Sequence, residues 1–170
     1  MAPESPPEDG PVLRVPAEIR DAILERARAG EPEEICGVFG GTFDPEESRV
    51  QSQYPADNVA DTPRTRYRID PEAQLEIFDR LEARGESIVG FYHSHPAGPP
   101  HPSETDAAAA AWPDRSYLIV SLEPRVVGSW RWRTTDDGDD GVDGDDTTDG
   151  DRAAETGHDG TFERERLVLE

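Results

Sequence analysis

Lysine is absent from this sequence, and all 17 of its basic residues are arginines. They are outnumbered by 38 acidic residues, which gives a formal net charge of -21 over 170 residues. Such a surface repels itself in dilute buffer and becomes tolerable where salt shortens the Debye length to about 3 Å at 1 M. The composition predicts a protein of a high-salt cytoplasm. It also disfavours nucleic acid as a partner, because so acidic a surface cannot neutralise phosphates.

Cysteine and long apolar runs are scarce as well. Cys36 is the only cysteine, so the chain cannot form an internal disulfide, and its apolar neighbours predict a buried packing residue. No segment approaches the ~20 apolar residues of a membrane span. Residues 1–10 lack the charged and apolar regions of a signal peptide and are expected to form a disordered leader. We therefore expect a cytoplasmic protein without membrane contact.

The segment from His93 to Asp106 contains the residue types of a metal-dependent hydrolase. It follows an apolar segment, 87–92, that is predicted to be a buried strand. Because strand side chains alternate between faces, His93 and His95 project to the same side and can share one ion. Prolines then turn the chain, and Ser103 is a predicted N-cap that places Asp106 one turn inside a helix. Two imidazoles and one carboxylate leave a tetrahedral Zn²⁺ one open position, which is typical of a catalytic zinc.

A hydrolytic zinc site also needs a base that is not a ligand. Glu34 is the candidate, because it lies where a polar helix end meets a short apolar strand. Three segments together resemble the signature of the JAMM (MPN+) metalloproteases. They are Glu-Ile-Cys-Gly at 34–37, His-Ser-His-Pro at 93–96 and Ser-Glu-Thr-Asp at 103–106. The resemblance covers about residues 12 to 133, resumes at Phe162, and is to a prokaryotic, salt-adapted branch of the family.

The resemblance implies a reaction, a cofactor and a partner. Zinc would be held by His93, His95 and Asp106 and would activate water. Glu34 would take the proton and return it to the leaving amine, while Ser103 would hydrogen-bond the oxyanion. The scissile bond would be the isopeptide or peptide bond after the C-terminal Gly-Gly of a ubiquitin-like small modifier protein, attached to lysines or in linear fusions. The modifier, its targets and the oligomeric state stay open.

Other functions compete with deconjugation. A related branch processes sulfur-carrier proteins with the same C-terminus, and nothing in the sequence separates the two activities. A non-catalytic MPN scaffold would lack the ligands that are intact here. A zinc nucleobase deaminase of related fold needs more than one cysteine. The histidine motif also resembles that of RadC-like DNA repair proteins, but the acidic composition disfavours a role in DNA repair.

The predicted fold class is α/β, with a curved mixed β-sheet sandwiched by helices, as in the JAMM/MPN family and in cytidine deaminases. Strands are expected at 12–15, 35–40, 49–54, 67–69, 87–92, 116–122, 126–133 and 162–169. Helices are expected at 16–29, with Ile19, Ile23 and Ala27 on one face, at 71–84, with Leu75, Phe78 and Leu81, and at 103–111.

An acidic insertion interrupts the single predicted domain, which covers residues 11–170. Residues 134–160 carry ten aspartates and one glutamate against a single arginine, too few apolar groups to form a core. Unstructured loops above ~12 to 15 residues are functional or disordered, and this composition favours disorder. The segment does not have the spacing of a calcium-binding EF-hand loop. Counted from Asp145, the last position of such a loop is Thr156, where a bidentate acidic ligand would be needed. The segment is predicted to be a solvating insertion in a hairpin.

The net charge leads to a prediction about salt. With a formal charge of -21, the melting temperature and the activity should both rise between about 0.1 M and about 2 M NaCl, because salt screens the self-repulsion. Differential scanning calorimetry across this range measures the effect. A melting temperature that stays constant over the range would contradict the prediction.

Overall fold

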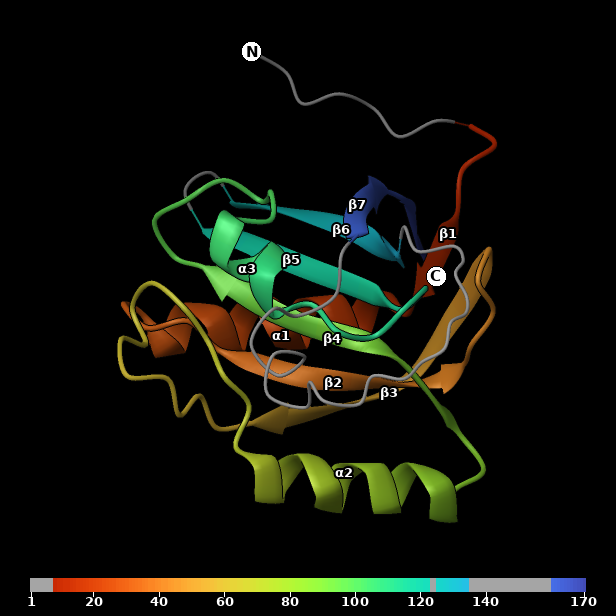
Figure 1. Cartoon of the computed structure of the whole chain (residues 1–170), viewed down its shortest axis with the longest axis horizontal. Helices are drawn as coiled ribbons and strands as arrows, with labels where there is room; N and C mark the ends of the chain where they lie inside the picture. Colours follow the sequence, from red (N-terminus) through yellow and green to blue (C-terminus); the bar gives the residue numbers. More distant parts are fainter. Residues whose placement is uncertain (1–7, 123–124, 135–159) are drawn as a thin grey trace, which may run out of the picture.

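The computed structural model describes residues 8–122, 125–134 and 160–170. In chain order the elements are β1 (Val12–Val15), α1 (Ala17–Gly30), β2 (Cys36–Thr42), β3 (Glu47–Ala56), α2 (Pro71–Ala83), β4 (Ser87–His95), α3 (Glu104–Ala109), β5 (Ser116–Leu122), β6 (Arg125–Thr134), β7 (Gly160–Arg164) and β8 (Arg166–Leu169). The strands form one mixed sheet in the order β7-β6-β5-β4-β2-β3-β1-β8 (Figure 1). The predicted class, a large curved mixed sheet flanked by helices, is confirmed.

The helices cover both faces of the sheet, and each face has its own apolar core. On one face, Ile23 and Ala27 of α1 pack against a cluster of buried strand residues. On the other face, Ile77 and Leu81 of α2 pack against a second cluster that includes Phe91. Figure 1 shows α1 behind the strands and α2 away from it, at the other side of the sheet. The predicted apolar face of the first helix is confirmed.

Strand β4 decides on which face the two histidines lie. Tyr92 belongs to the core under α1, and Phe91 belongs to the core under α2. Because neighbouring strand residues point to opposite faces, His93 and His95 follow Phe91 to the α2 face. Helix α3 also lies on this side of β4 (Figure 1).

The apolar face of α2 differs from the predicted one. Leu75 was expected to be part of it, but this side chain is 64% exposed, whereas Ile77 is buried. Ile77 and Leu81 are four residues apart and therefore lie on one side of the helix. Leu75 precedes Ile77 by two residues, which is about 200° around an α-helix, so the two cannot share a face.

Residues 67–69 do not form the predicted strand. Ile69 makes a single antiparallel bridge with Asn58, and no longer ladder exists in this connection between β3 and α2. The side-chain oxygen of Asn58 accepts the N–H groups of Ala60 and Arg68, each at 3.0 Å. These local side-chain bonds use backbone donors that a strand pair would need.

The predicted last strand, 162–169, is in fact two strands. β7 ends at Arg164 and pairs with β6, whereas β8 begins at Arg166 and pairs with β1, at the other end of the strand order. Glu165 between them is 1% exposed and meets the guanidinium of Arg131 at 2.6 Å. In the sequence this glutamate looks like the polar position of an alternating strand, which is why the break was not predicted.

Arg131 and Glu165 form a buried ion pair where the two ends of the sheet meet. Ser129 and Ser116 donate their hydroxyl groups to the carboxylate, at 2.5 and 3.3 Å. The remaining guanidinium N–H groups donate to the carbonyl oxygens of Val12, Asp44, Pro45 and Asp114. A buried pair needs such additional hydrogen bonds, because they offset the desolvation of the two charges.

Some predictions concern residues outside the described ranges. Of the leader at 1–10, only residues 8–10 are described, and of the insertion at 134–160 only the two end residues are. Those ends, Thr134 and Gly160, pair across the antiparallel strands β6 and β7, as expected at the base of a hairpin. Cys36 is buried, as predicted. None of the helices that the structure describes is long and apolar enough to cross a membrane.

The ion pair leads to a prediction about stability. Glu165→Gln should lower the free energy of unfolding by about 3–5 kcal/mol, because it leaves the charge of Arg131 buried without a counter-charge. Glu46→Gln is the control, since Glu46 meets Arg133 at 3.3 Å with 71% of its side chain exposed. That change should cost less than about 1 kcal/mol. Equal urea midpoints for the two variants would show that the buried pair adds no stability.

Candidate metal centre

Two histidines at the end of β4 meet at one point. His93 is paired with Cys36 of β2 and Ile119 of β5, so the backbone is held from both sides. His95 is still paired with β5, at Ser121. The Nε2 atoms of the two imidazoles lie 3.2 Å apart. Both rings therefore face the same side of the strand, as the alternation predicts.

Helix α3 brings a carboxylate to the same point. Ser103 accepts the N–H of Asp106 at 3.0 Å, and the Asp106 carboxylate accepts the N–H of Ser103 at 2.9 Å, which completes a capping box. The same carboxylate oxygen, Oδ2, lies 3.2 Å from Nε2 of His93 and 3.1 Å from Nε2 of His95. Burial alone would raise the pKa of Asp106, but the hydrogen bonds to the two histidines hold it well below its usual range.

These three atoms form a triangle that fits a metal ion. Two ligand atoms bound to a tetrahedral zinc at about 2.0–2.1 Å are separated by about 3.3 Å. The observed separations are 3.1 to 3.2 Å. Nδ1 of His95 lies 2.8 Å from the carbonyl oxygen of Pro99 and can only donate to it, which leaves the lone pair of Nε2 for a metal. The donor set therefore suits a bound cation without rearrangement.

Glu34 lies beside the triangle, two residues before β2. Its side chain is 5% exposed, and its Oε1 atom is buried without a hydrogen-bond partner among the described residues. Ligand atoms of Glu34, His93 and His95 lie within 4.8 Å of one another. Burial raises the pKa of Glu34 to about 7, where a carboxyl group can both accept and release a proton near neutral pH. Asp106 Oδ2 lies 3.1 to 3.2 Å from both histidines, so Asp106 as third ligand and Glu34 as base stay the predicted roles.

A cleft of about 380 Å³ opens next to the centre, lined by Glu34, His95, Ser103, Arg64 and the proline-rich loop 96–102. Ser103 is exposed at its rim. Its hydroxyl oxygen accepts the Asp106 N–H, and its hydroxyl hydrogen has no acceptor among the described residues. The predicted N-cap is confirmed, while the role of Ser103 toward an oxyanion stays a prediction.

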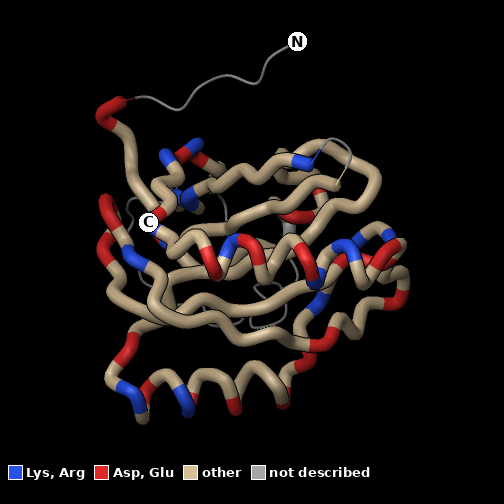
Figure 2. The backbone as a smooth tube through the Cα atoms, turned by 180° about the vertical axis from the view of Figure 1, so that it is seen from behind, with Lys and Arg blue, Asp and Glu red and all other residues tan. Residues whose placement is uncertain are grey.

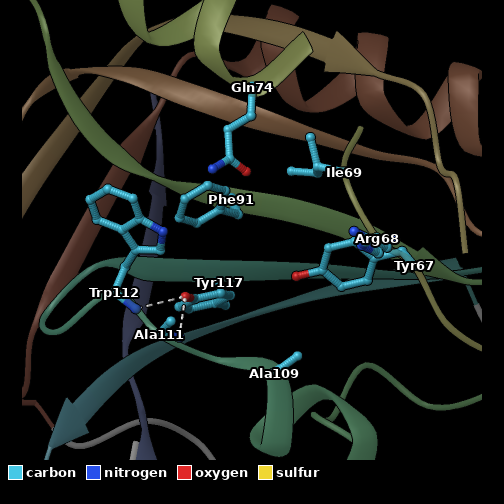
Figure 3. Close-up of a pocket in the computed structure, with 9 residues that line it drawn as sticks. All are labelled: Tyr67, Arg68, Ile69, Gln74, Phe91, Ala109, Ala111, Trp112 and Tyr117. Carbon is cyan, nitrogen blue, oxygen red and sulfur yellow. Dashed lines mark hydrogen bonds between the residues drawn. The ribbon is translucent and has the colours of Figure 1, made fainter. Parts of the chain in front are cut away.

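Two residues of the centre were not identified from the sequence. Tyr67 stacks on the imidazole of His93, with ring centroids 4.3 Å apart and planes inclined by 23°. Asn58 donates from Nδ2 to the carbonyl oxygen of Glu34 at 2.9 Å. Figure 3 shows Tyr67 at one end of a second, largely aromatic pocket of about 200 Å³, with its hydroxyl group directed inward. The only hint in the sequence was that both residues lie within the range of about residues 12 to 133 that resembles the metalloprotease family.

Comparison with known proteins places the chain in a family. A model described as prokaryotic homologs of the JAB domain matches residues 16–133. The chain belongs to this family. This JAB-domain protein is 43% identical over 118 residues to a desampylase of Haloferax volcanii, a match that covers 67% of this chain and 84% of the relative. The predicted resemblance to JAMM/MPN metalloproteases is confirmed.

Other similarities of this JAB-domain protein agree. A CysO-cysteine peptidase of Mycobacterium tuberculosis is 39% identical over 111 residues, 65% of this chain and 73% of the relative. A probable TtuB-protein conjugate cleaving protease of Thermus thermophilus is 37% identical over 107 residues, which cover 61% of this chain and 66% of the relative. The solution structure of a protein from Desulfitobacterium hafniense superposes with a TM-score of 0.70 at 27% identity and covers 93% of this chain and 92% of that one. Family and relatives indicate a hydrolase.

The assignment of ligands and base leads to a prediction about metal content. His93→Ala, His95→Ala and Asp106→Ala should each reduce the zinc that remains bound after dialysis, because each removes one of the three predicted protein ligands. Glu34→Gln should keep stoichiometric zinc, since a base is not needed to hold the ion. Elemental analysis by mass spectrometry measures both effects. Loss of zinc from Glu34→Gln would make Glu34 a ligand and not the base.

Proposed function

We propose that this JAB-domain protein is a zinc-dependent isopeptidase that cleaves after the C-terminal Gly-Gly of ubiquitin-like small modifier proteins, in lysine conjugates and in linear fusions. The observation that carries the proposal is the triangle of His93 Nε2, His95 Nε2 and Asp106 Oδ2. Beside it lies a carboxylate oxygen of Glu34 that has no hydrogen-bond partner within the described part of the chain. Three protein ligands and an open position are typical of catalytic zinc. Relatives named desampylase and TtuB-protein conjugate cleaving protease support the substrate class.

Each side chain has a task in amide hydrolysis. Bound zinc would supply a Lewis acid that activates water and polarises the scissile carbonyl group. His93, His95 and Asp106 would hold it. Glu34 accepts a proton from the attacking water and delivers it to the leaving amine, a transfer that its pKa of about 7 suits. Ser103 donates its hydroxyl hydrogen to the carbonyl oxygen as negative charge develops there.

A second candidate is the processing of a sulfur-carrier protein. The relative named CysO-cysteine peptidase, at 39% identity, supports this activity. Both reactions hydrolyse an amide bond at the C-terminus of a ubiquitin-like protein, so the same side chains serve either one. They differ in the amine that leaves, which is the ε-amine of a lysine in a conjugate and the α-amine of cysteine in the other case. We prefer deconjugation because the relative with 43% identity is named a desampylase.

We further propose that the protein works in a high-salt cytoplasm. Figure 2 shows acidic residues along α1, α2 and the surface turns, with arginines between them. Several of these arginines make direct ion pairs, such as Arg14 with Glu47 and Arg49 with Glu170, each at 2.6 Å. Salt screens the repulsion between distant charges more than it screens such contacts. The surface is therefore suited to high ionic strength.

Cleavage assays in molar salt test the proposed function. A modifier joined to a lysine through its C-terminal Gly-Gly should be released, a chelator should stop the reaction, and added zinc should restore it. Glu34→Gln should lower the rate by about 10² to 10⁴-fold, the usual contribution of a positioned base. The exposed neighbour provides the matched control, and Glu33→Gln should keep the wild-type rate.

Mass spectrometry of the products identifies the bond that is cut. An intact conjugate after incubation with zinc-loaded wild-type protein would refute deconjugation. If a modifier–cysteine adduct were cleaved while the lysine conjugate stayed intact, the sulfur-carrier activity would be the function.

A further inference from the structure

The connection between β3 and α2, residues 57–70, is attached to the metal centre at Glu34. The N–H of Glu34 donates to the carbonyl oxygen of Pro63 at 2.8 Å. Its carbonyl oxygen accepts Nδ2 of Asn58 at 2.9 Å. Both backbone polar groups of the proposed base are therefore held by this one connection, which crosses from the sheet to α2 in Figure 1.

Asn58, the only asparagine in the sequence, uses its whole amide group in this region. Nδ2 donates to the carbonyl oxygens of Glu34 and Arg66, at 2.9 and 3.1 Å. Oδ1 accepts the N–H groups of Ala60 and Arg68, each at 3.0 Å. A primary amide offers two donors and two acceptor positions, so all four are used. The partners also fix its orientation, because the nitrogen faces two carbonyl groups and the oxygen faces two N–H groups.

The second attachment to the metal centre is through Tyr67. This residue lies between Arg66 and Arg68, and Asn58 holds the backbone of both neighbours. The Tyr67 ring stacks on His93 with centroids 4.3 Å apart. Through its two bonds on either side of Tyr67, the Asn58 amide thus controls where the aromatic ring stands.

The orientation of the His93 ring depends on this stacking, because no residue that the structure describes gives this ring the hydrogen bond that orients His95. His93 is 1% exposed, and its Nδ1 atom has no hydrogen-bond partner among the described residues. Nδ1 of His95, by contrast, is held by the carbonyl oxygen of Pro99 at 2.8 Å. A metal-binding imidazole is usually oriented by a hydrogen bond of its second nitrogen. For His93, the stacked ring of Tyr67 takes this part.

We propose that Asn58 is a positioning residue for both halves of the centre: it places Glu34 through the Glu34 carbonyl group, and it orients His93 through Tyr67. The part that concerns Glu34 rests on the proposed hydrolase function. The part that concerns His93 does not, because metal affinity can be measured without any substrate.

The first test is Asn58→Ala. We expect kcat to fall by about 10 to 100-fold, and zinc affinity to fall by a factor in the same range, as for other residues that orient metal ligands. KM should change by less than about twofold, because Asn58 does not line the cleft and a change in ground-state binding is not expected. Competition with a chromogenic chelator gives the zinc affinity.

The control for general destabilisation is Ser52→Ala. Ser52 donates to Glu86 at 2.6 Å, a half-buried side-chain hydrogen bond remote from the centre. It should lower the melting temperature without changing kcat or zinc affinity. If Asn58→Ala did no more than this control, Asn58 would be a structural residue and the proposal would be wrong. Asn58→Asp keeps the two acceptor positions and removes both donors, and it gives the same test should the alanine variant not fold.

Variants of Tyr67 test the second path. Tyr67→Phe keeps the stacked ring and should keep wild-type zinc affinity, whereas Tyr67→Leu should weaken zinc binding about as much as Asn58→Ala does. If Asn58 acts on His93 through Tyr67, the double variant Asn58→Ala/Tyr67→Leu should bind zinc no more weakly than Tyr67→Leu alone. Additive losses would overturn this path. If wild-type protein failed to cleave Gly-Gly conjugates, the proposed function would be wrong. The zinc affinities of the single and double variants would still decide the role of Asn58.

Discussion

The ion pair between Arg131 and Glu165 is the buried contact that links the two ends of the sheet. Glu165 is the single residue between β7 and β8, strands that lie at the two ends of the strand order. Its carboxylate holds a guanidinium that also binds backbone oxygens near β1, β3 and β5. With both ends of the sheet tied to one side chain, the central strands β2, β4 and β5 are kept in the arrangement that brings Glu34, His93 and α3 together.

The buried carboxylates of this acidic protein differ in how they are satisfied. Glu165 has a guanidinium and two hydroxyl groups, and Asp106 has two imidazoles and a backbone N–H. Glu34 is buried with one oxygen unpartnered among the described residues. A buried oxygen without a hydrogen-bond partner lowers the stability of the fold, so natural proteins contain few of them, and each one needs an explanation such as a function. Of the three, Glu34 is therefore the carboxylate whose burial is least compensated by contacts among the described residues.

The features that the sequence predicted are those that depend on local geometry. His93 and His95 follow from the alternation of a strand, and Ser103 with Asp106 follows from the capping of a helix. Glu34 was a candidate from its place at a helix end before an apolar strand, but only the resemblance connected it to the histidines, because no local pattern reaches residues so far along the chain. Asn58 and Tyr67 were missed for the same reason. The break at Glu165 and the exposure of Leu75 were mispredicted because each is decided by a distant partner: a buried arginine in one case and the packing of α2 in the other.

The capping box of α3 has a practical consequence for the choice of reagents. The oxygen of Asp106 that faces both histidines is the same atom that accepts the Ser103 N–H. Asp106→Ala therefore also removes half of the capping box at the first turn of α3, beside the rim of the cleft, so this variant changes more than the predicted metal ligand. Glu34→Gln leaves both hydrogen bonds of the capping box in place. It is the better bait for trapping and identifying natural conjugates from cell extracts.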